Sequence, residues 1–198
     1  MLSPKAAERA TVQPMALGQG THQLGPSNGS LYLCTAREGM AAKVGHDLLL
    51  QITRWSGTVT VPDPGDLSTA SLSLRIETDS LAVIGGTGGV SPLDDSDKAD
   101  ILKNALKTLD VVHHPVAEFH STAIRPAADG GEIEGTLKLA GASGTVTLAV
   151  SATGDASWKA TGTVVQSQYG IKPYKAFLGA LRLADPVTVE AEVSLTLN

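Results

Sequence analysis

Most of the chain alternates between apolar and polar residues with a period of two. The segment SLSLRIE places Leu72, Leu74 and Ile76 on one face of an extended chain, with Ser73 and Arg75 on the other. Residues 187–197 repeat the pattern over six apolar positions, and residues 132–150 repeat it twice more. Strands with one dry and one wet face are typical of antiparallel sheets. The sequence therefore predicts an all-β fold.

Short turn signals separate these segments: PDPGD at 62–66, DGG at 129–131, GASG at 141–144 and TGDAS at 153–157. Many short strands joined by tight turns predict a meander that closes on itself, as a sandwich or an up-and-down barrel. The run at 44–61, VGHDLLLQITRWSGTVTV, is long for one strand, and its alternation slips around Trp55 to Gly57. We interpret it as a bulged strand that bends around the corner of a tall barrel.

One segment, residues 91–112, has helical spacing instead. Its apolar residues are Ile101, Leu102, Ala105, Leu106 and Leu109. Acidic residues crowd its start and lysines follow, an order that suits the helix dipole, and residues 94–96 offer N-cap candidates. This predicts one amphipathic helix, inserted between strands, that covers one end of the barrel. The preceding GGTGGV at 85–90 is interpreted as a flexible connection.

The length of 198 residues favours one domain. We expect residues 1–20 to form a mobile N-terminal tail, with a short helical turn at 4–9, and residues 21–198 to form the barrel. Hydrophobic residues make up 42% of the chain and aromatic residues only 4%. A core of Val, Leu, Ile and Ala with few aromatic fillers allows an unfilled interior.

The net charge of −5 and the absence of any run of Lys or Arg argue against nucleic acid as a partner. The single cysteine, Cys34, excludes an intrachain disulfide and is interpreted as a small buried thiol. No apolar run approaches the roughly 20 residues of a membrane-spanning helix. The first twenty residues lack a charged start followed by an apolar segment, so we expect a cytoplasmic location for the chain as written. A periplasmic or secreted location follows if a signal has been removed.

The histidines are the candidates for metal or acid–base chemistry. His113 and His114 are adjacent, and His120 shares a strand face with Glu118, opposite Phe119. No HxH or HExxH spacing occurs, and no GxSxG motif is present. We interpret these histidines as ordinary loop and surface residues, and we predict neither a metal site nor a cofactor.

The pair His46 and Asp47 opens the segment that continues with Leu48, Leu49 and Leu50. Neighbouring residues of an extended strand point to opposite faces, so this pair cannot act together as acid and orienting group. Either residue can face the interior, and His46 is interpreted as a polar group at a cavity rim. The leucines begin an apolar wall.

The segment QSQYGIKPYKAFLGALRL at 166–183 breaks the alternation and holds much of the chain's aromatic content. Its apolar residues are interleaved with Lys172, Lys175 and Arg182. Two interpretations stay open: the mouth of a pocket for a lipid with an anionic head, or a loop packed over a core with solvated lysines.

Several of these segments together resemble the YceI-like family of polyisoprenoid-binding proteins, over Thr21 to Asn198. The most specific part is the helix that leads into His114, Pro115, Phe119 and Ser121. The strand Gly135–Leu139 and the motif at 169–171, Tyr-Gly-Ile, add to the resemblance.

The resemblance implies an extended, lipocalin-like antiparallel barrel of about eight strands with an apolar tunnel. Such a tunnel takes a polyprenyl chain, as in an isoprenoid quinone or a polyprenyl phosphate, with the head group near the mouth and no catalytic residues. Three features depart from the family: no secretory signal is seen, Gln166 and Gln168 stand where many members have Arg, and Asp47 with leucines follows His46 in place of Gly-Phe.

We therefore predict a carrier or sequestering protein for a long isoprenoid or a related amphiphile, and not an enzyme. The predicted lining residues are Leu48, Leu50, Ile52, Phe119, Leu137, Leu148 and Val164, and those near the mouth are Tyr169, Ile171, Lys172, Tyr174 and Phe177. A homodimer that covers the barrel openings is compatible with this prediction. The alternatives are a small metal-dependent hydrolase or isomerase that uses His46 and Asp47, and a filled barrel that serves only as a protein-interaction module.

Overall fold

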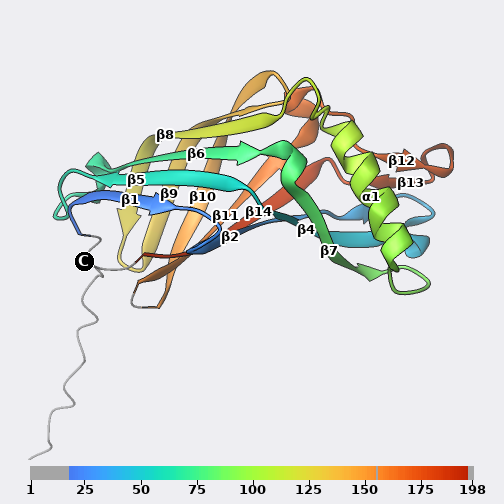
Figure 1. Cartoon of the computed structure of the whole chain (residues 1–198), viewed down its shortest axis with the longest axis horizontal. Coiled ribbons are helices and arrows are strands. Elements are labelled where there is room, and N and C mark those ends of the chain that lie inside the picture. The colour runs from blue at the N-terminus through green and yellow to red at the C-terminus, as the bar shows by residue number, and fades with distance from the viewer. Residues whose placement is uncertain (1–17, 155, 196–198) are drawn as a thin grey trace, which may run out of the picture.

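The computed structural model describes residues 18–154 and 156–195. The predicted tail lies almost wholly outside these residues, as does its predicted helical turn, and the first strand already begins at Gly20. The chain forms a long antiparallel sheet that curls around an apolar interior, with one helix lying across one end (Figure 1). The predicted all-β class with one inserted amphipathic helix is confirmed.

Within the described residues the large sheet has eleven strands, in the order β1-β5-β6-β8-β9-β10-β11-β14-β2-β4-β7. Their bounds are β1 Gly20–Leu24, β2 Gly29–Cys34, β4 His46–Ile52, β5 Trp55–Val61, β6 Ser71–Glu77, β7 Leu81–Gly88, β8 Val116–Ala127, β9 Gly130–Leu139, β10 Ala142–Gly154, β11 Ser157–Val165 and β14 Pro186–Ser194. A small second sheet, in the order β12-β13-β3, consists of β12 Lys175–Ala176, β13 Leu181–Leu183 and β3 Arg37–Glu38. Five 3₁₀ turns are found in the same part of the chain: η1 Ala42–Val44, η2 Leu67–Thr69, η3 Thr78–Ser80, η4 Gln166–Tyr169 and η5 Phe177–Gly179.

The strand number differs from the predicted eight because two long strands are split by a corner. β4 runs into β5, and β6 runs into β7, yet β4 and β5 pair with different strands of the sheet. If each pair counts as one bent strand and the short edge strand β1 is set aside, eight of the eleven strands remain.

The corner lies at Thr53 and Arg54, two residues before the predicted slip. Ser80, in the 3₁₀ turn η3 between β6 and β7, stabilises this corner. Its carbonyl accepts from the Thr53 N–H at 3.0 Å, and its hydroxyl accepts from the Arg54 N–H at 3.0 Å. β5 alternates regularly beyond this point, and the apparent slip arose because Gly57 has no side chain. The Leu74 side chain packs over Gly57, where a Cβ would come within 2.5 Å of Leu74 Cδ2.

Of the glycine-rich segment 85–90 that was predicted as a flexible connection, residues 85–88 instead belong to β7. Gly85 and Gly86 pair with Leu49 and Leu48 of β4, which places this segment at the end of the sheet order. Gly86 has no room for a side chain, because a Cβ there would lie 3.0 Å from both the His46 Cβ and Leu93. Close packing, and not flexibility, explains this glycine.

The predicted helix is α1, Asp95–Thr108. Asp94 caps it and forms a capping box with Asp97, in agreement with the N-cap prediction. The helix contacts β7 but no residue of it is fully buried, so its apolar face rests on an incompletely filled space. Among the residues that the structure describes, no helix is long and apolar enough to cross a membrane.

Tyr169 is the largest side chain that is almost completely inaccessible, with 2% of its surface exposed. It packs over Gly144 of β10, where a Cβ would lie 2.8 Å from the phenolic oxygen. That oxygen has no hydrogen-bond partner among the residues described, and burial raises the pKa of the phenol. Tyr169 therefore contributes packing at the cost of a desolvated hydroxyl.

We expect Tyr169→Phe to be neutral or stabilising by up to about 2 kcal/mol at pH 7, because it removes an unpaired buried hydroxyl. Folding raises the pKa of Tyr169, so the pH-dependent part of its contribution to stability is fully present below its unfolded pKa of about 10. As pH rises from there through the folded pKa, the phenol ionises first in the unfolded state, and this part of the stability is lost. The wild type should therefore lose more stability than Tyr169→Phe above about pH 10. Urea unfolding between pH 7 and 11 measures this, with Tyr174→Phe as the control. Equal pH profiles for wild type and Tyr169→Phe would contradict the assignment.

Candidate ligand cavity

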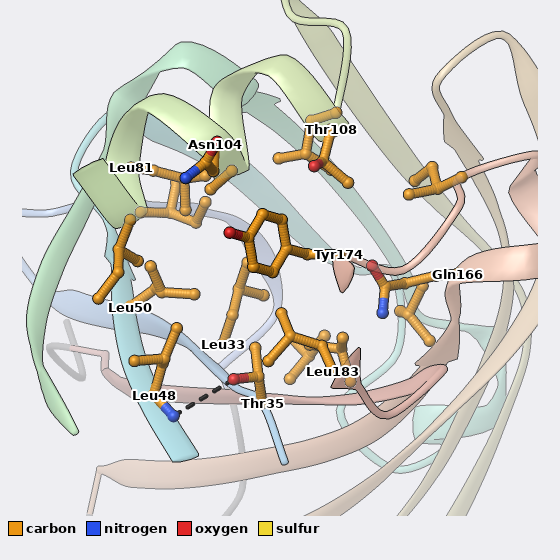
Figure 2. A pocket seen from close by; sticks show the side chains of 18 of the residues that line it. Leu33, Thr35, Leu48, Leu50, Leu81, Asn104, Thr108, Gln166, Tyr174 and Leu183 are labelled. Carbon is orange, nitrogen blue, oxygen red and sulfur yellow. Dashed lines mark hydrogen bonds between the residues drawn. The ribbon is translucent and has the colours of Figure 1, made fainter. Parts of the chain in front are cut away.

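A cavity of about 800 Å³ occupies the half of the barrel next to α1. Its wall is formed by apolar side chains on the inner faces of most strands, and Figure 2 shows several of them converging on the same space. The apolar lining includes Leu31, Leu33, Leu48, Leu50, Ile52, Leu74, Ile76, Leu81, Ala117, Phe119, Leu137, Leu139, Val146, Leu148, Ala160, Val164, Ile171, Leu181, Leu183, Val187, Val189 and Ala191, and the region of α1 adds Leu93, Ile101, Ala105 and Leu109. The alternation that predicted the strands thus places one face of nearly every strand on this cavity.

The other half of the barrel is filled. On β6, Leu74 and Ile76 line the cavity, whereas Leu72 on the same strand face is buried outside it. The same change occurs on β14 between Ala191 and Val193. We call the packed part the solid half; its residues include Leu24, Trp55, Leu72, Ile133, Trp158 and Val193. The tryptophans, which are the largest side chains of the protein, therefore both lie in the solid half.

Nine of the twelve predicted site residues lie on the cavity wall: Leu48, Leu50, Ile52, Phe119, Leu137, Leu148, Val164, Ile171 and Tyr174. Most of them lie on strands, where inward positions alternate with outward ones, so the periodicity accounts for their place on the wall. Their part in binding a ligand stays a prediction. Figure 2 shows the Tyr174 ring among Leu33, Leu50 and Leu183, so this aromatic residue reaches from its loop into the cavity.

The other three predicted site residues, Tyr169, Lys172 and Phe177, lie outside the cavity wall. Tyr169 packs over Gly144 on the far side of its 3₁₀ turn, where Gly170 takes a left-handed φ of 72° that reverses the chain. Lys172 is exposed, and Phe177 is 68% exposed on the β12–β13 turn. The irregular backbone of 166–183 has no fixed period, so the sequence could not show which of its side chains turn inward.

Helix α1 contributes polar groups that the sequence analysis did not assign to the site. Asn104 and Thr108 point from the helix toward the cavity, one turn apart, beside Ile101 and Ala105 (Figure 2). Their i, i+4 spacing on the edge of the apolar stripe was the signal that could have identified them.

Gln166 also lines the cavity, although the sequence analysis did not assign it to the site. Its side chain is 9% exposed, and its amide nitrogen donates to the Ala184 carbonyl at 2.9 Å and the Asp185 carbonyl at 3.2 Å. Figure 2 shows its amide oxygen on the side of Tyr174. The position therefore presents a neutral hydrogen-bond acceptor to the cavity.

The mouth is shaped by Arg37 and His46, which pack against the glycines at the end of β7. Gly88 and Gly89 have positive φ angles of 86° and 71°, and a side chain on either would overlap Arg37 or His46. Arg37 Nη1 donates to the Gly45 carbonyl at 2.7 Å and to the Thr87 carbonyl at 2.8 Å. The arginine thereby ties β3 to the open ends of β4 and β7.

His46 and Asp47 make separate interactions. His46 lines the cavity and its Nε2 lies 2.9 Å from the Ser91 carbonyl, which can only accept, so Nε2 carries the proton. One Asp47 carboxylate oxygen accepts from the Arg37 backbone N–H at 2.8 Å on the other face of the strand. The pair is not arranged as an acid and its orienting group. In residues 18–154 and 156–195, no three His, Cys, Asp or Glu side chains form a group that could hold a metal ion.

Cys34 was expected to be a small buried thiol, and it is partly buried. Burial, and next the nearby Glu190 carboxylate, raise the pKa of its thiol. A raised pKa keeps the sulfur protonated at neutral pH and makes it a poor nucleophile.

Two of the lining cations, Arg37 and Arg182, are already engaged with acidic or carbonyl groups. Arg37 lies 3.9 Å from the Asp47 carboxylate, and Arg182 Nε donates to Glu38 at 3.2 Å. A further lining cation, Lys103, shares its helix with Asp97 and Asp100, which also line the cavity. The wall therefore carries no cluster of uncompensated positive charge within the described residues.

Comparison with known proteins agrees with this architecture. A family model described as "YceI-like domain" matches residues 32–198, which confirms the resemblance seen in the sequence. The structure of BcnA from Burkholderia cenocepacia is similar with a TM-score of 0.63 and 18% identity, and the match covers 86% of this chain and 98% of that one. The YCEI protein of Campylobacter jejuni is similar with a TM-score of 0.54 and 13% identity, over 75% of this chain and 85% of that one. At these identities the two structures support the fold alone. No curated protein matches the chain.

Because one half of the barrel is hollow, we predict that replacing two similarly buried leucines by alanine lowers the free energy of unfolding by different amounts. Leu72, in the solid half, and Leu137, on the cavity wall, are 7% and 8% exposed. Leu72→Ala should cost about 2–5 kcal/mol because it opens a new void, whereas Leu137→Ala enlarges an existing one and should cost about 2 kcal/mol or less. Denaturant unfolding of the ligand-free protein measures both. Equal losses would show that the cavity half is packed like the other.

Proposed function

Because this chain belongs to the YceI-like domain family, whose model spans residues 32–198, we propose that it binds one long isoprenoid lipid or a related amphiphile. The apolar chain of the lipid lies in the barrel cavity and its head group lies at the mouth beside α1. The protein then acts as a carrier, or as a store that keeps the lipid out of water. The proposal includes no catalytic step.

The observation that carries the proposal is the mainly apolar lining of a cavity of about 800 Å³. Pockets that enclose small ligands commonly measure about 300–1,000 Å³. Burial of apolar surface contributes about 25 cal/mol per Å², so a branched hydrocarbon chain binds here without any polar contact. An empty space of this size between leucines and valines would lower stability unless a ligand fills it.

The polar groups of the wall favour a neutral head group, such as a quinone or an alcohol, over a phosphate. Asn104, Thr108, Gln166 and Tyr174 offer neutral donors and acceptors, and all line the cavity. A phosphate needs cations that are free to pair with it, whereas Arg37 and Arg182 already serve carbonyl and carboxylate partners. Neutral hydrogen-bonding groups suffice to orient a quinone or an alcohol.

Substitutions that fill the cavity test whether the hydrocarbon chain of a lipid binds there. Ala160 lines it and pairs with Ala191 of β14, while Ala149 is exposed on the outer face of the adjacent strand. Ala160→Phe should weaken the binding of a prenyl quinone at least tenfold, about 1.4 kcal/mol, and Ala149→Phe should leave it unchanged. Native mass spectrometry of the purified protein, followed by titration of a delipidated sample, measures both. A wild-type protein that takes up no prenyl ligand would overturn the carrier proposal in favour of the interaction module.

The head-group preference is tested with ligands of one chain length. A prenyl alcohol should bind at least as tightly as the corresponding prenyl phosphate, because the mouth offers neutral partners. Competition between the two for the delipidated protein measures the ratio of their dissociation constants. A preference of tenfold or more for the phosphate, removed by Lys103→Gln, would show that Lys103 provides a free cation.

A further inference from the structure

Three apolar side chains stand out from the protein at the turn between β12 and β13 and beside it. Phe177 is 68% exposed, Leu178 is 110% exposed, and Met40 is 96% exposed. Met40 belongs to the neighbouring segment, where Ala41 N–H donates to the Ala180 carbonyl of the turn at 2.9 Å. We call these three residues the mouth tip. Figure 1 shows the β12–β13 hairpin projecting beyond α1 at the end of the molecule.

The backbone of the mouth tip is strained. Phe177 and Leu178 have φ angles of 50° and 55°, in the left-handed region that bulky residues rarely adopt. Gly179 follows with a φ of 90°. Strain of this kind persists where a function maintains it, and here it turns two apolar side chains outward in succession. A turn selected only for stability would carry Gly or Asn at these positions.

The surroundings of the mouth tip are cationic although the whole chain has a net charge of −5. The two segments that form this region, 36–45 and 172–183, contain five cations and one acid, Glu38. The cations are Arg37, Lys43, Lys172, Lys175 and Arg182. Glu38 and the nearby Asp47 pair with Arg182 and Arg37. The three lysines are exposed and add positive charge around the apolar side chains.

Acidic residues at the mouth lie on another element. Asp94, Asp95, Asp97 and Asp100 crowd the start of α1, where Asp94 and Asp97 are engaged in the capping box. Lys98, Lys103 and Lys107 on the same helix offset three of these four negative charges. The cationic and apolar groups are thus concentrated on the projecting hairpin side of the mouth.

The mouth tip is also continuous with the cavity. Val44, Tyr174 and Leu181 to Leu183 flank it in the chain, and all of them line the cavity. A surface that meets the tip therefore also meets the opening of the barrel.

We propose that the mouth tip docks on an anionic membrane surface, with Met40, Phe177 and Leu178 inserted among the lipids and the lysines around them facing the head groups. Apolar side chains in the interface together with surrounding Lys and Arg are the features that hold peripheral proteins on anionic bilayers. A second copy of the chain is a poorer partner, because two positively charged tips would repel each other. The docking rests on the exposed tip alone; its role as the route by which a lipid enters the cavity rests on the proposed function.

Sedimentation with unilamellar vesicles tests the docking. The full chain should bind vesicles of phosphatidylcholine with phosphatidylglycerol, and should bind vesicles of phosphatidylcholine alone at least tenfold more weakly. Met40→Ser combined with Leu178→Ser should reduce binding to the anionic vesicles at least tenfold. Val112→Ser is the matched control, since Val112 is an apolar residue that is 83% exposed in the link after α1. Lys43→Gln with Lys175→Gln should weaken binding and flatten its dependence on salt.

The two proposals fail in different ways. Uptake of a prenyl ligand from dilute detergent should be the same for the wild type and for Met40→Ser with Leu178→Ser, because neither residue lines the cavity. Equal vesicle binding by this variant and the wild type would overturn the docking and leave the carrier proposal intact. Another outcome is that the wild type forms a dimer in sedimentation velocity, that the same variant abolishes this dimer, and that neither protein binds vesicles. That outcome would identify a second copy as the partner and overturn the membrane-docking proposal. Vesicle docking without any ligand uptake would overturn the carrier proposal alone.

Discussion

The architecture depends on continuous backbone pairing around a corner. An antiparallel sheet that ends in open edges exposes unpaired N–H and C=O groups, and curling the sheet on itself is one way to satisfy them. Here the chain bends at Thr53 and Arg54 between β4 and β5, opposite the turn between β6 and β7. Ser80 of that turn accepts hydrogen bonds from both residues with its carbonyl and its hydroxyl. Ser80 is only 3% exposed, so no water competes for these bonds. The bend directs β4 and β7 to one side of the wall and β5 and β6 to the other.

Curling also creates the interior, and side-chain volume decides which part of it is filled. In the solid half, Trp55 and Trp158 occupy the space between the walls. Toward α1 most inward positions carry leucine, isoleucine, valine or alanine, and these side chains leave a space between the walls even with Phe119 among them. Some strand positions carry glycine and leave room for a larger side chain on the neighbouring strand, as Gly135 does for the Phe119 ring. The cavity is therefore a consequence of residue size along otherwise equivalent strand faces.

The sequence was sufficient for features that have a period or a local signal. Alternation identified the inward faces, and the acidic start of residues 91–112 identified α1 and its cap at Asp94. Features set by tertiary contacts were not visible: the strand at Gly85 to Gly88 contains few side chains that could show a period, and Gly57 interrupted a regular strand only in appearance. The orientation of Tyr169 and Phe177 depends on positive φ angles nearby, which a residue pattern does not report.

The separation into a filled half and a hollow half has a consequence for how this fold changes over generations. The same strand can carry residues of both halves at different positions along its length. On β6, Leu72 is buried in the solid half and Leu74 lines the cavity. Substitutions on the hollow side reshape the space while the tryptophan-containing side keeps the chain folded. We therefore expect stability to restrict substitutions less on the hollow side than on the solid side. The same fold is found in two structures that are only 18% and 13% identical to this chain.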